Sequence, residues 1–316
     1  MPRAEGGSDV MHGFVLALFA ATILVTAPLV LDRAEAAGFS PRLVQQGWRA
    51  AAGGALVSLA LAVPVFTTDL WTAPARAMGI APGLGFVDVP LAVQVAVACA
   101  VLLGVAAGWR RGGPVVRDYR RALRVQLDRL EATSPVLDEV ERGHPRLVIV
   151  EDAQPRLVLL PSRPPRVEVT TRALDLLEPE ELNAVLTHMS GHLRRRDALW
   201  MTASETMAEA YPRVGFFVRW ADHSAALAEK GADADVHGPI ARSNLRRALA
   251  KLSGPGQANG PFCPCFAWPQ QRQEELTVRR PGTPRTPYAV VALRALTAAA
   301  LLVPTLVVAS PHFMYI

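Results

Sequence analysis

The sequence predicts a mainly α-helical membrane protein, in which four transmembrane helices carry an α+β domain inserted between the third and the fourth. Two observations predict this fold class. Hydrophobic residues make up 51% of the 316 residues and fall in blocks instead of spreading evenly. Short β-like runs and amphipathic helical patterns lie between the third and fourth blocks. We therefore expect a three-span region at 1–109, an inserted domain at 110–287, and a last span with a short tail at 288–316.

The four apolar blocks differ in how well each matches a bilayer core of about 30 Å. Residues 13–31 contain no charge, and residues 89–109 are apolar apart from Gln94. Residues 50–66 form a shorter block, and residues 288–309 include Arg294, so these two spans need packing against neighbouring helices. The first block has acidic residues before it and an apolar core too long for a signal peptide, so we expect it to stay in the mature protein.

The arginines between the blocks indicate the orientation of the chain. The first loop contains Arg33, Arg42 and Arg49, the second contains only Arg76, and the third opens with the arginine-rich residues 110–129. Cytoplasmic loops carry an excess of Lys and Arg. We therefore expect a multi-pass protein of the inner (plasma) membrane, with its N-terminus and tail outside and the inserted domain in the cytoplasm.

The net charge of +5 does not indicate nucleic acid as a partner, because the basic residues cluster beside span ends, where anionic lipid headgroups account for them. The cysteines are few: Cys99 lies within a span, and Cys263 and Cys265 lie in the insert. No disulfide framework is expected. The Cys-Pro-Cys sequence lacks a second cysteine pair to complete a metal site, which favours an ordinary loop.

The first half of the insert reads as a helix followed by a small sheet. Residues 115–130 have apolar side chains at helical spacing with arginines between them, which predicts an amphipathic helix lying along the inner membrane surface. Three β-like runs follow at 147–150, 156–160 and 166–171, separated by Asp, Pro and Ser turns. They predict a sheet of two or three strands.

The second half of the insert is predicted to be helical. Glu178-Pro179-Glu180-Glu181 has the proline and the acidic residues that suit a first helical turn. A further helical stretch follows Pro212 and continues to Asp233, and residues 245–252 also look helical. Residues 253–269 are rich in Gly, Pro and Gln and predict a loop.

A pair of histidines on the first of these helices carries the main functional signal. His188 and His192 are four residues apart, which places both imidazoles on one face of a helix, where they can share a metal. In the H-E-x-x-H motif of zinc peptidases, the residue after the first histidine is a glutamate that acts as general base. Here that position is Met189, which cannot take a proton and lies close to the apolar stripe, so it also fits a packing role.

A catalytic zinc needs three protein ligands and one open position, so the histidine pair requires a third donor. Glu229 is the best candidate, and Asp233, one turn later, is placed to accept a hydrogen bond from a ligating histidine. Glu205 and Glu209 lie on or near the histidine helix but too far along it to replace the missing base. His223 and His237 flank the Glu229 element, either as further site residues or as exposed histidines at helix ends.

These residues resemble the BlaR/MecR-type membrane metallopeptidases, which are related more distantly to the HtpX and prenyl-protein (CAAX) proteases. The resemblance rests on the strand at 166–171, the run from Pro179 through His188 and His192 to Arg196-Asp197, and Glu229-x-x-x-Asp233. Three spans before the insert and one after it also match. The resemblance implies a gluzincin-like metallopeptidase domain with zinc on His188, His192 and Glu229, and a protein or peptide substrate.

Two departures from that family bear on function. The position of the catalytic glutamate holds Met189, so the resemblance supports the metal ligands but not peptide hydrolysis by the usual route. Antibiotic-sensing members carry a penicillin-binding domain after the last span, whereas this sequence ends at Ile316, so we expect no direct β-lactam sensing.

The sequence therefore leaves two functions open. One is a membrane zinc metallopeptidase homologue related to site-specific cleavage of a regulatory protein, with impaired or lost hydrolysis. The other is a catalytically inactive pseudoprotease that binds a protein partner as a membrane scaffold. A transport protein is disfavoured, because Arg294 is the only charge well inside a predicted span.

Overall fold

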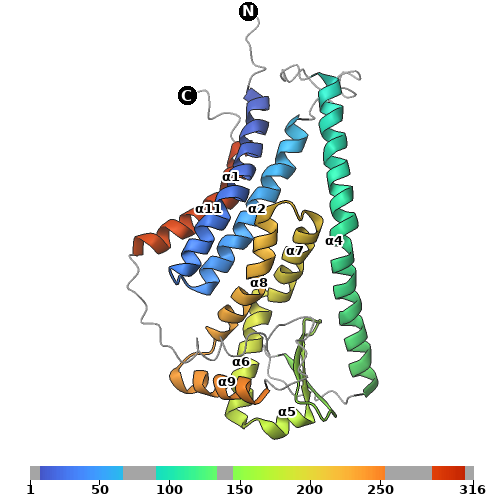
Figure 1. The fold of residues 1–316 in the computed structure, drawn as a ribbon, viewed down its shortest axis with the longest axis vertical. Coiled ribbons are helices and arrows are strands. Elements are labelled where there is room, and N and C mark those ends of the chain that lie inside the picture. The colour runs from blue at the N-terminus through green and yellow to red at the C-terminus, as the bar shows by residue number, and fades with distance from the viewer. Residues whose placement is uncertain (1–7, 67–89, 134–144, 253–286, 310–316) are drawn as a thin grey trace, which may run out of the picture.

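The computed structural model describes residues 8–66, 90–133, 145–252 and 287–309. Over these residues the chain is mostly helical, with one small sheet (Figure 1). The elements, in chain order, are α1 (Ser8–Ala36), α2 (Pro41–Phe66), α4 (Leu91–Thr133), β1 (Arg146–Val150), β2 (Leu157–Leu160), β3 (Arg166–Thr170), α5 (Thr171–Leu176), α6 (Pro179–Arg195), α7 (Asp197–Ala210), α8 (Gly215–Asp233), α9 (Pro239–Leu252) and α11 (Pro287–Ala309).

Three of these helices are long and apolar enough to cross a membrane. The stretches are Gly13–Ala36 in α1, Pro41–Pro64 in α2 and Leu91–Ala132 in α4, whereas the apolar stretch of α11, Tyr288–Pro304, is shorter. Large apolar side chains are exposed along these helices, as expected where helices face lipid. They include Phe14, Leu18 and Val25 on α1, Leu102, Leu103 and Trp109 on α4, and Val291, Leu296 and Leu306 on α11. The structure therefore agrees with a mainly α-helical membrane protein.

Helix α4 corrects the prediction of a separate amphipathic helix on the membrane surface. It is one helix of 43 residues, about 65 Å long at 1.5 Å per residue, which is about twice the thickness of the bilayer core. Figure 1 shows it running nearly straight down one side of the molecule. Residues 115–130 continue the axis of the predicted span as part of the same helix, instead of forming a second helix that turns away from it. The predicted domain boundary at residue 109 falls inside this helix.

Helices α1, α2 and α11 pack together, and α8 packs against α1 and α2 from below (Figure 1). A turn with Gly38 at φ 74° reverses the chain between α1 and α2. The core of this bundle contains the fully buried Trp48 of α2 together with Phe216 and Trp220 of α8. Through these aromatic side chains the apolar helices hold one of the helices of the inserted domain.

The predicted small sheet, of two or three strands, is confirmed: it has three strands, in the order β1-β3-β2. β1 runs parallel to β3 and β2 runs antiparallel to it. Val167 and Val169 of β3 face a core shared with α5, α6 and α9, while Val148 of β1 and Leu160 of β2 pack near Leu130 of α4. The sheet thus lies between the lower end of α4 and the histidine-bearing helix α6.

The predicted start of α6 is confirmed. The Glu181 carboxylate accepts a hydrogen bond from the Glu178 backbone N–H at 3.1 Å, and Pro179 occupies the first turn, so both features cap the helix. The helix ends where Arg196 adopts a left-handed conformation, with φ 53°, and α7 begins at the next residue. Glu205 and Glu209 therefore lie on a separate helix. The predicted loop at 253–269, with Cys263 and Cys265, lies outside the described residues.

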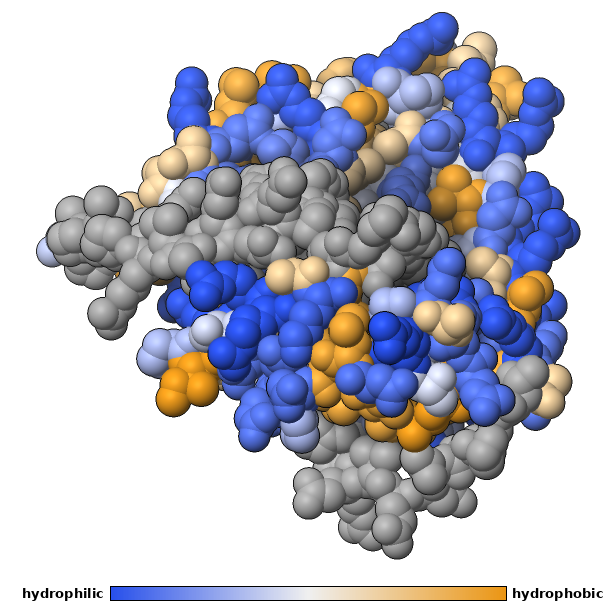
Figure 2. Space-filling model, turned by 60° about the horizontal axis from the view of Figure 1, so that its bottom comes forward, coloured by the Kyte–Doolittle hydropathy of each residue, from blue (hydrophilic) through white to orange (hydrophobic). Residues whose placement is uncertain are grey.

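Figure 2 brings forward the end of the molecule that carries the sheet and α9. Hydrophilic side chains cover most of the described surface there, with small apolar patches between them. This surface contrasts with the exposed apolar side chains of α1, α4 and α11. The two ends of the molecule are therefore suited to different surroundings, one aqueous and one apolar.

Candidate metal centre

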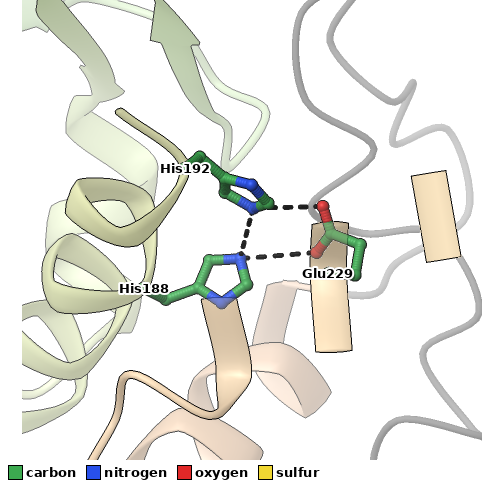
Figure 3. A group of neighbouring side chains, drawn as sticks. All are labelled: His188, His192 and Glu229. Atoms are coloured by element: carbon green, nitrogen blue, oxygen red, sulfur yellow. Dashed lines mark hydrogen bonds and ion pairs between the residues drawn. The ribbon is translucent and has the colours of Figure 1, made fainter. Parts of the chain in front are cut away.

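Two neighbouring helices bring the predicted ligands together. His188 and His192 lie one turn apart on α6, and Glu229 lies on α8, which packs against α6. Figure 3 shows the two imidazoles and the carboxylate pointing toward one another from opposite sides. All three side chains are buried, with relative exposures of 1–3%. Glu229 is 37 residues away from the nearer histidine in the sequence. The packing of α6 on α8 brings them together.

The three donor groups are close enough to share one ion. His192 Nε2 lies 3.1 Å from His188 Nε2 and 3.2 Å from Glu229 Oε1, and His188 Nε2 lies 3.4 Å from Glu229 Oε2. A metal bound at about 2.0–2.1 Å separates two tetrahedral ligands by about 3.3–3.4 Å. The donor spacing matches that value, so this buried group could hold a metal ion.

The outer nitrogen of each histidine meets an aspartate. His192 Nδ1 lies 2.9 Å from Asp197 Oδ2, and His188 Nδ1 lies 2.9 Å from Asp233 Oδ1. An aspartate at Nδ1 favours a proton on that nitrogen, which leaves Nε2 with a lone pair directed at the shared position. A hydrogen bond to Asp197 thus orients the ring of His192, whereas Asp233 lies close to His188 Nδ1 without hydrogen-bond geometry.

The charges around His192 favour its protonated form when no metal is bound. Burial lowers the pKa of His192, but the charge of Glu229 and the hydrogen bond to Asp197 outweigh this effect and raise it to about 9. An imidazolium at this position donates from Nδ1 to Asp197 and from Nε2 toward Glu229. A metal cation bound between the three side chains would replace the Nε2 proton. The carboxylates therefore stabilise a positive charge at this position both with and without a metal.

Asp197 joins the metal centre to a network of basic side chains. Burial raises the pKa of Asp197, but the hydrogen bonds and charges of His192 and Arg195 lower it overall, so it is a carboxylate. Its Oδ2 accepts from Arg195 Nε at 3.1 Å, and its Oδ1 accepts from Arg49 Nη2 at 2.8 Å and Gln45 Nε2 at 3.1 Å. Arg195 also bonds Asp235 and the backbone carbonyl of Gly231 on α8.

The structure brings the four predicted site residues close together: His188, His192 and Glu229 converge, and Asp233 lies beside His188. The role of Asp197 was missed. The sequence placed Arg49 in a loop before the second span, whereas it lies inside α2, where a charged side chain needs a polar partner.

The remaining candidates lie elsewhere in the structure. His223 is inside α8, not at its end, and its Nδ1 lies 3.1 Å from Glu35 of α1. His237 is exposed after the end of α8. Neither residue belongs to the group formed by His188, His192 and Glu229.

Met189 is completely buried, at 0% exposure, in the core shared by the sheet, α6 and α9. Its neighbours in that core include Val169, Val236 and Leu245. The side chain thus occupies the packing position that its place near the apolar stripe predicted. It offers no group that can take a proton from a metal-bound water.

Comparisons of the chain with protein-family models, with curated proteins and with solved structures found no match.

Proposed function

We propose that the protein is a membrane zinc metallopeptidase homologue of the BlaR/MecR type in which peptide hydrolysis is impaired or lost. The observation that carries this proposal is the convergence of His188, His192 and Glu229, with donor spacings of 3.1–3.4 Å. Two imidazoles and one carboxylate are a set of protein donors typical of catalytic zinc sites, in which water takes the fourth position. The Asp197 and Asp233 contacts are the outer interactions that such ligands usually have.

Bound zinc would polarise a substrate carbonyl and lower the pKa of its water. The chain supplies the ligands for that ion, but Met189 stands where the general base is needed. General-base catalysis contributes about 10²- to 10⁴-fold to a rate, so we expect at most trace hydrolysis.

A second function, a pseudoprotease that binds a protein partner without cleaving it, is favoured by the surroundings of Met189. The methionine is fully buried among apolar side chains, as an adapted part of the core. In this reading the metal holds α6 and α8 together and the partner is a protein or peptide. A structural role of that kind needs the ligands but no general base.

The proposed setting is the inner membrane, with four spans and the metal centre on the cytoplasmic side. Support comes from α1, α2 and α4, which are long and apolar enough to cross a membrane, and from the arginines near their predicted cytoplasmic ends. The shorter apolar helix α11 would be the fourth span and relies on packing against α2.

A peptidase assay on the zinc-loaded, detergent-purified protein separates the two functions. A quenched-fluorescent peptide library is cleaved by the wild type, by Met189→Glu, and by a His188→Ala/His192→Ala double mutant as the metal-free control. A peptidase homologue with a lost base gains at least about tenfold activity in Met189→Glu. A pseudoprotease gives the rate of the control in all three proteins, with Met189→Glu still folded in a thermal-unfolding measurement at the assay temperature.

A further inference from the structure

Helix α2 carries two charges in its apolar stretch, and both contact the carboxylates around the metal centre. Within Pro41–Pro64 the charged residues are Arg42 and Arg49. A charge in such a segment is costly and requires a partner. Arg49 pairs with Asp197, and Arg42 pairs with Asp235. The two arginines are seven residues apart, about two helical turns, so they lie on the same face of α2.

Asp197 connects that face of α2 to a ligand of the proposed metal. Its Oδ1 accepts hydrogen bonds from Arg49 and Gln45 of α2, at 2.8 and 3.1 Å. Its Oδ2 contacts His192 Nδ1 at 2.9 Å. The carboxylate is 1% exposed, so water does not compete for these bonds. A continuous series of contacts thus runs from α2 through Asp197 to the ring of His192.

Arg49 is itself held in one arrangement. Its guanidinium is stacked 5.1 Å from the ring of Trp200 on α7, and its Nη1 donates to the backbone carbonyl of Arg195 at the end of α6. The side chain is 14% exposed. Arg49 therefore bridges the break between α6 and α7 at Arg196, where the chain turns and Asp197 is placed beside His192.

We propose that Arg49 is a positioning residue of the metal centre, and that the end of α2 that carries Arg49 thereby sets the metal affinity. A displacement of α2 relative to α6 moves the Asp197 carboxylate and, with it, the hydrogen bond that orients His192. This coupling depends on one part of the proposed function, namely that His188, His192 and Glu229 are the zinc ligands. It makes the metal centre responsive to the position of a transmembrane helix.

The test is the zinc affinity of the full-length, detergent-purified protein, measured by competition with a chromophoric chelator. Changes to the outer partners of zinc ligands cost about 10- to 100-fold in affinity. Arg49→Gln, which keeps much of the side-chain length and removes the charge, is expected to weaken zinc binding about tenfold. The matched control is Arg219→Gln, because Arg219 forms an interhelical ion pair with Asp32, at 3.0 Å, away from the metal centre. The control is expected to stay within about twofold of the wild type.

A double-mutant cycle distinguishes positioning through Asp197 from a general loss of packing. Asp197→Asn alone is expected to weaken zinc binding by at least about tenfold. In that background, Arg49→Gln should cost less than about twofold more, because its route to His192 is already weakened. Equal and additive losses in both backgrounds would overturn the positioning role. Visible spectra of the cobalt-loaded proteins give a second readout, with bands shifted in Arg49→Gln and unshifted in Arg219→Gln.

The outcomes separate this coupling from the metal site itself. If the wild type binds zinc and Arg49→Gln binds it equally well, the coupling is wrong and the metal site stands. If the wild type binds no more zinc than the His188→Ala/His192→Ala double mutant, the proposed function fails and the coupling fails with it. Should Arg49→Gln not fold, Gln45→Ala removes one hydrogen bond to the same Asp197 oxygen. An affinity equal to that of the wild type would then overturn the coupling.

Discussion

Met189 stands at the position where the zinc-peptidase motif has its general base. Its surroundings, however, are apolar and suit a methionine. It is 0% exposed in a core with Val169 and Leu245. A carboxylate placed there loses its hydration, and an uncompensated buried charge is strongly destabilising. The fold and the usual hydrolytic chemistry therefore favour different residues at this position.

We predict that Met189→Glu lowers the stability of the protein by about 3 kcal/mol or more, whereas Met189→Leu costs less than about 1.5 kcal/mol. The size of the side chain is similar in both variants, so the difference reports the buried charge. Thermal unfolding of the detergent-purified proteins measures it. Equal stability of the two variants would show that a carboxylate at this position reaches the metal or water, and would favour a latent peptidase.

The candidate metal ligands could be picked out from the sequence because the two histidines, and the two acidic residues, stand at helical spacing. His188 and His192 are four residues apart, and Asp233 follows Glu229 by four, so each pair occupies one helix face whatever the tertiary structure. The role of Asp197 depends on a left-handed turn at Arg196, which places the first residue of α7 beside the last turns of α6. Periodicity does not specify a turn of that kind, so this contact was missed.

Helices α2 and α11 approach each other closely at a small residue of α2. A Cβ atom added at Gly54 of α2 would lie 2.1 Å from the backbone oxygen of Ala300 in α11, whereas one added at Gly53 would lie 3.5 Å from a Leu301 methyl group. Helices in membranes depend on such close backbone approaches. Gly54 therefore lets α11 pack against α2.

We predict that Gly54→Ala destabilises the protein by about 1–3 kcal/mol, because α2 and α11 must separate to admit the methyl group. Gly53→Ala is the matched control, since its added methyl group makes an ordinary van der Waals contact. Thermal unfolding in detergent compares the two neighbouring variants. A melting temperature for Gly54→Ala equal to that of Gly53→Ala would contradict the close packing of α2 on α11.

A second contact between elements, that of α8 with α1, depends on pH. His223 Nδ1 lies 3.1 Å from Glu35, its Nε2 lies 3.5 Å from Asp32, and its ring stacks on Trp48. The hydrogen bond to Glu35 raises the pKa of His223, burial opposes the rise, and the charges of Glu35, Asp32 and Asp222 add to it. The other charged neighbours of this cluster are Arg219, which pairs with Asp32, and Lys230, which pairs with Glu35.

The protonated His223 stabilises the folded state, because its pKa is higher there than the unfolded value of about 6.5. The stabilisation is complete below that unfolded value and is lost as pH rises through the raised folded value. We predict that the stability difference between wild type and His223→Gln shrinks above neutral pH. It stays below about 1 kcal/mol throughout, because the pair is partly exposed. Thermal unfolding across pH 5–9 measures it, and a difference that does not vary with pH would contradict the ion pair.

Helix types were predicted better than helix extents. The sequence located α6, α8 and the strands, because capping residues and turn residues mark their ends. It divided α4 into a span and a surface helix, because the composition changes from apolar to arginine-rich near residue 110. A straight helix that leaves the membrane changes from apolar to charged residues at the membrane surface. A span followed by a separate surface helix shows the same change, so composition alone cannot distinguish the two arrangements.

At the scale of the whole molecule, the metal centre lies where the apolar helices meet the inserted domain. Helices α1 and α2 contact α8, which carries Glu229, and α2 also reaches the α6–α7 junction through Arg49. The long helix α4 packs along α7 and supports the sheet (Figure 1). The parts of the fold that would lie in the membrane therefore hold both helices that supply the metal ligands.

Elemental analysis of the detergent-purified protein measures whether the junction of α2, α6 and α8 binds zinc. The matched control is the His188→Ala/His192→Ala double mutant, which removes two of the three ligands and reports adventitious binding. We predict about one zinc per chain in the wild type and none above background in the double mutant. Equal zinc content in the two proteins would contradict it and leave a membrane protein whose buried histidines and glutamate serve packing alone.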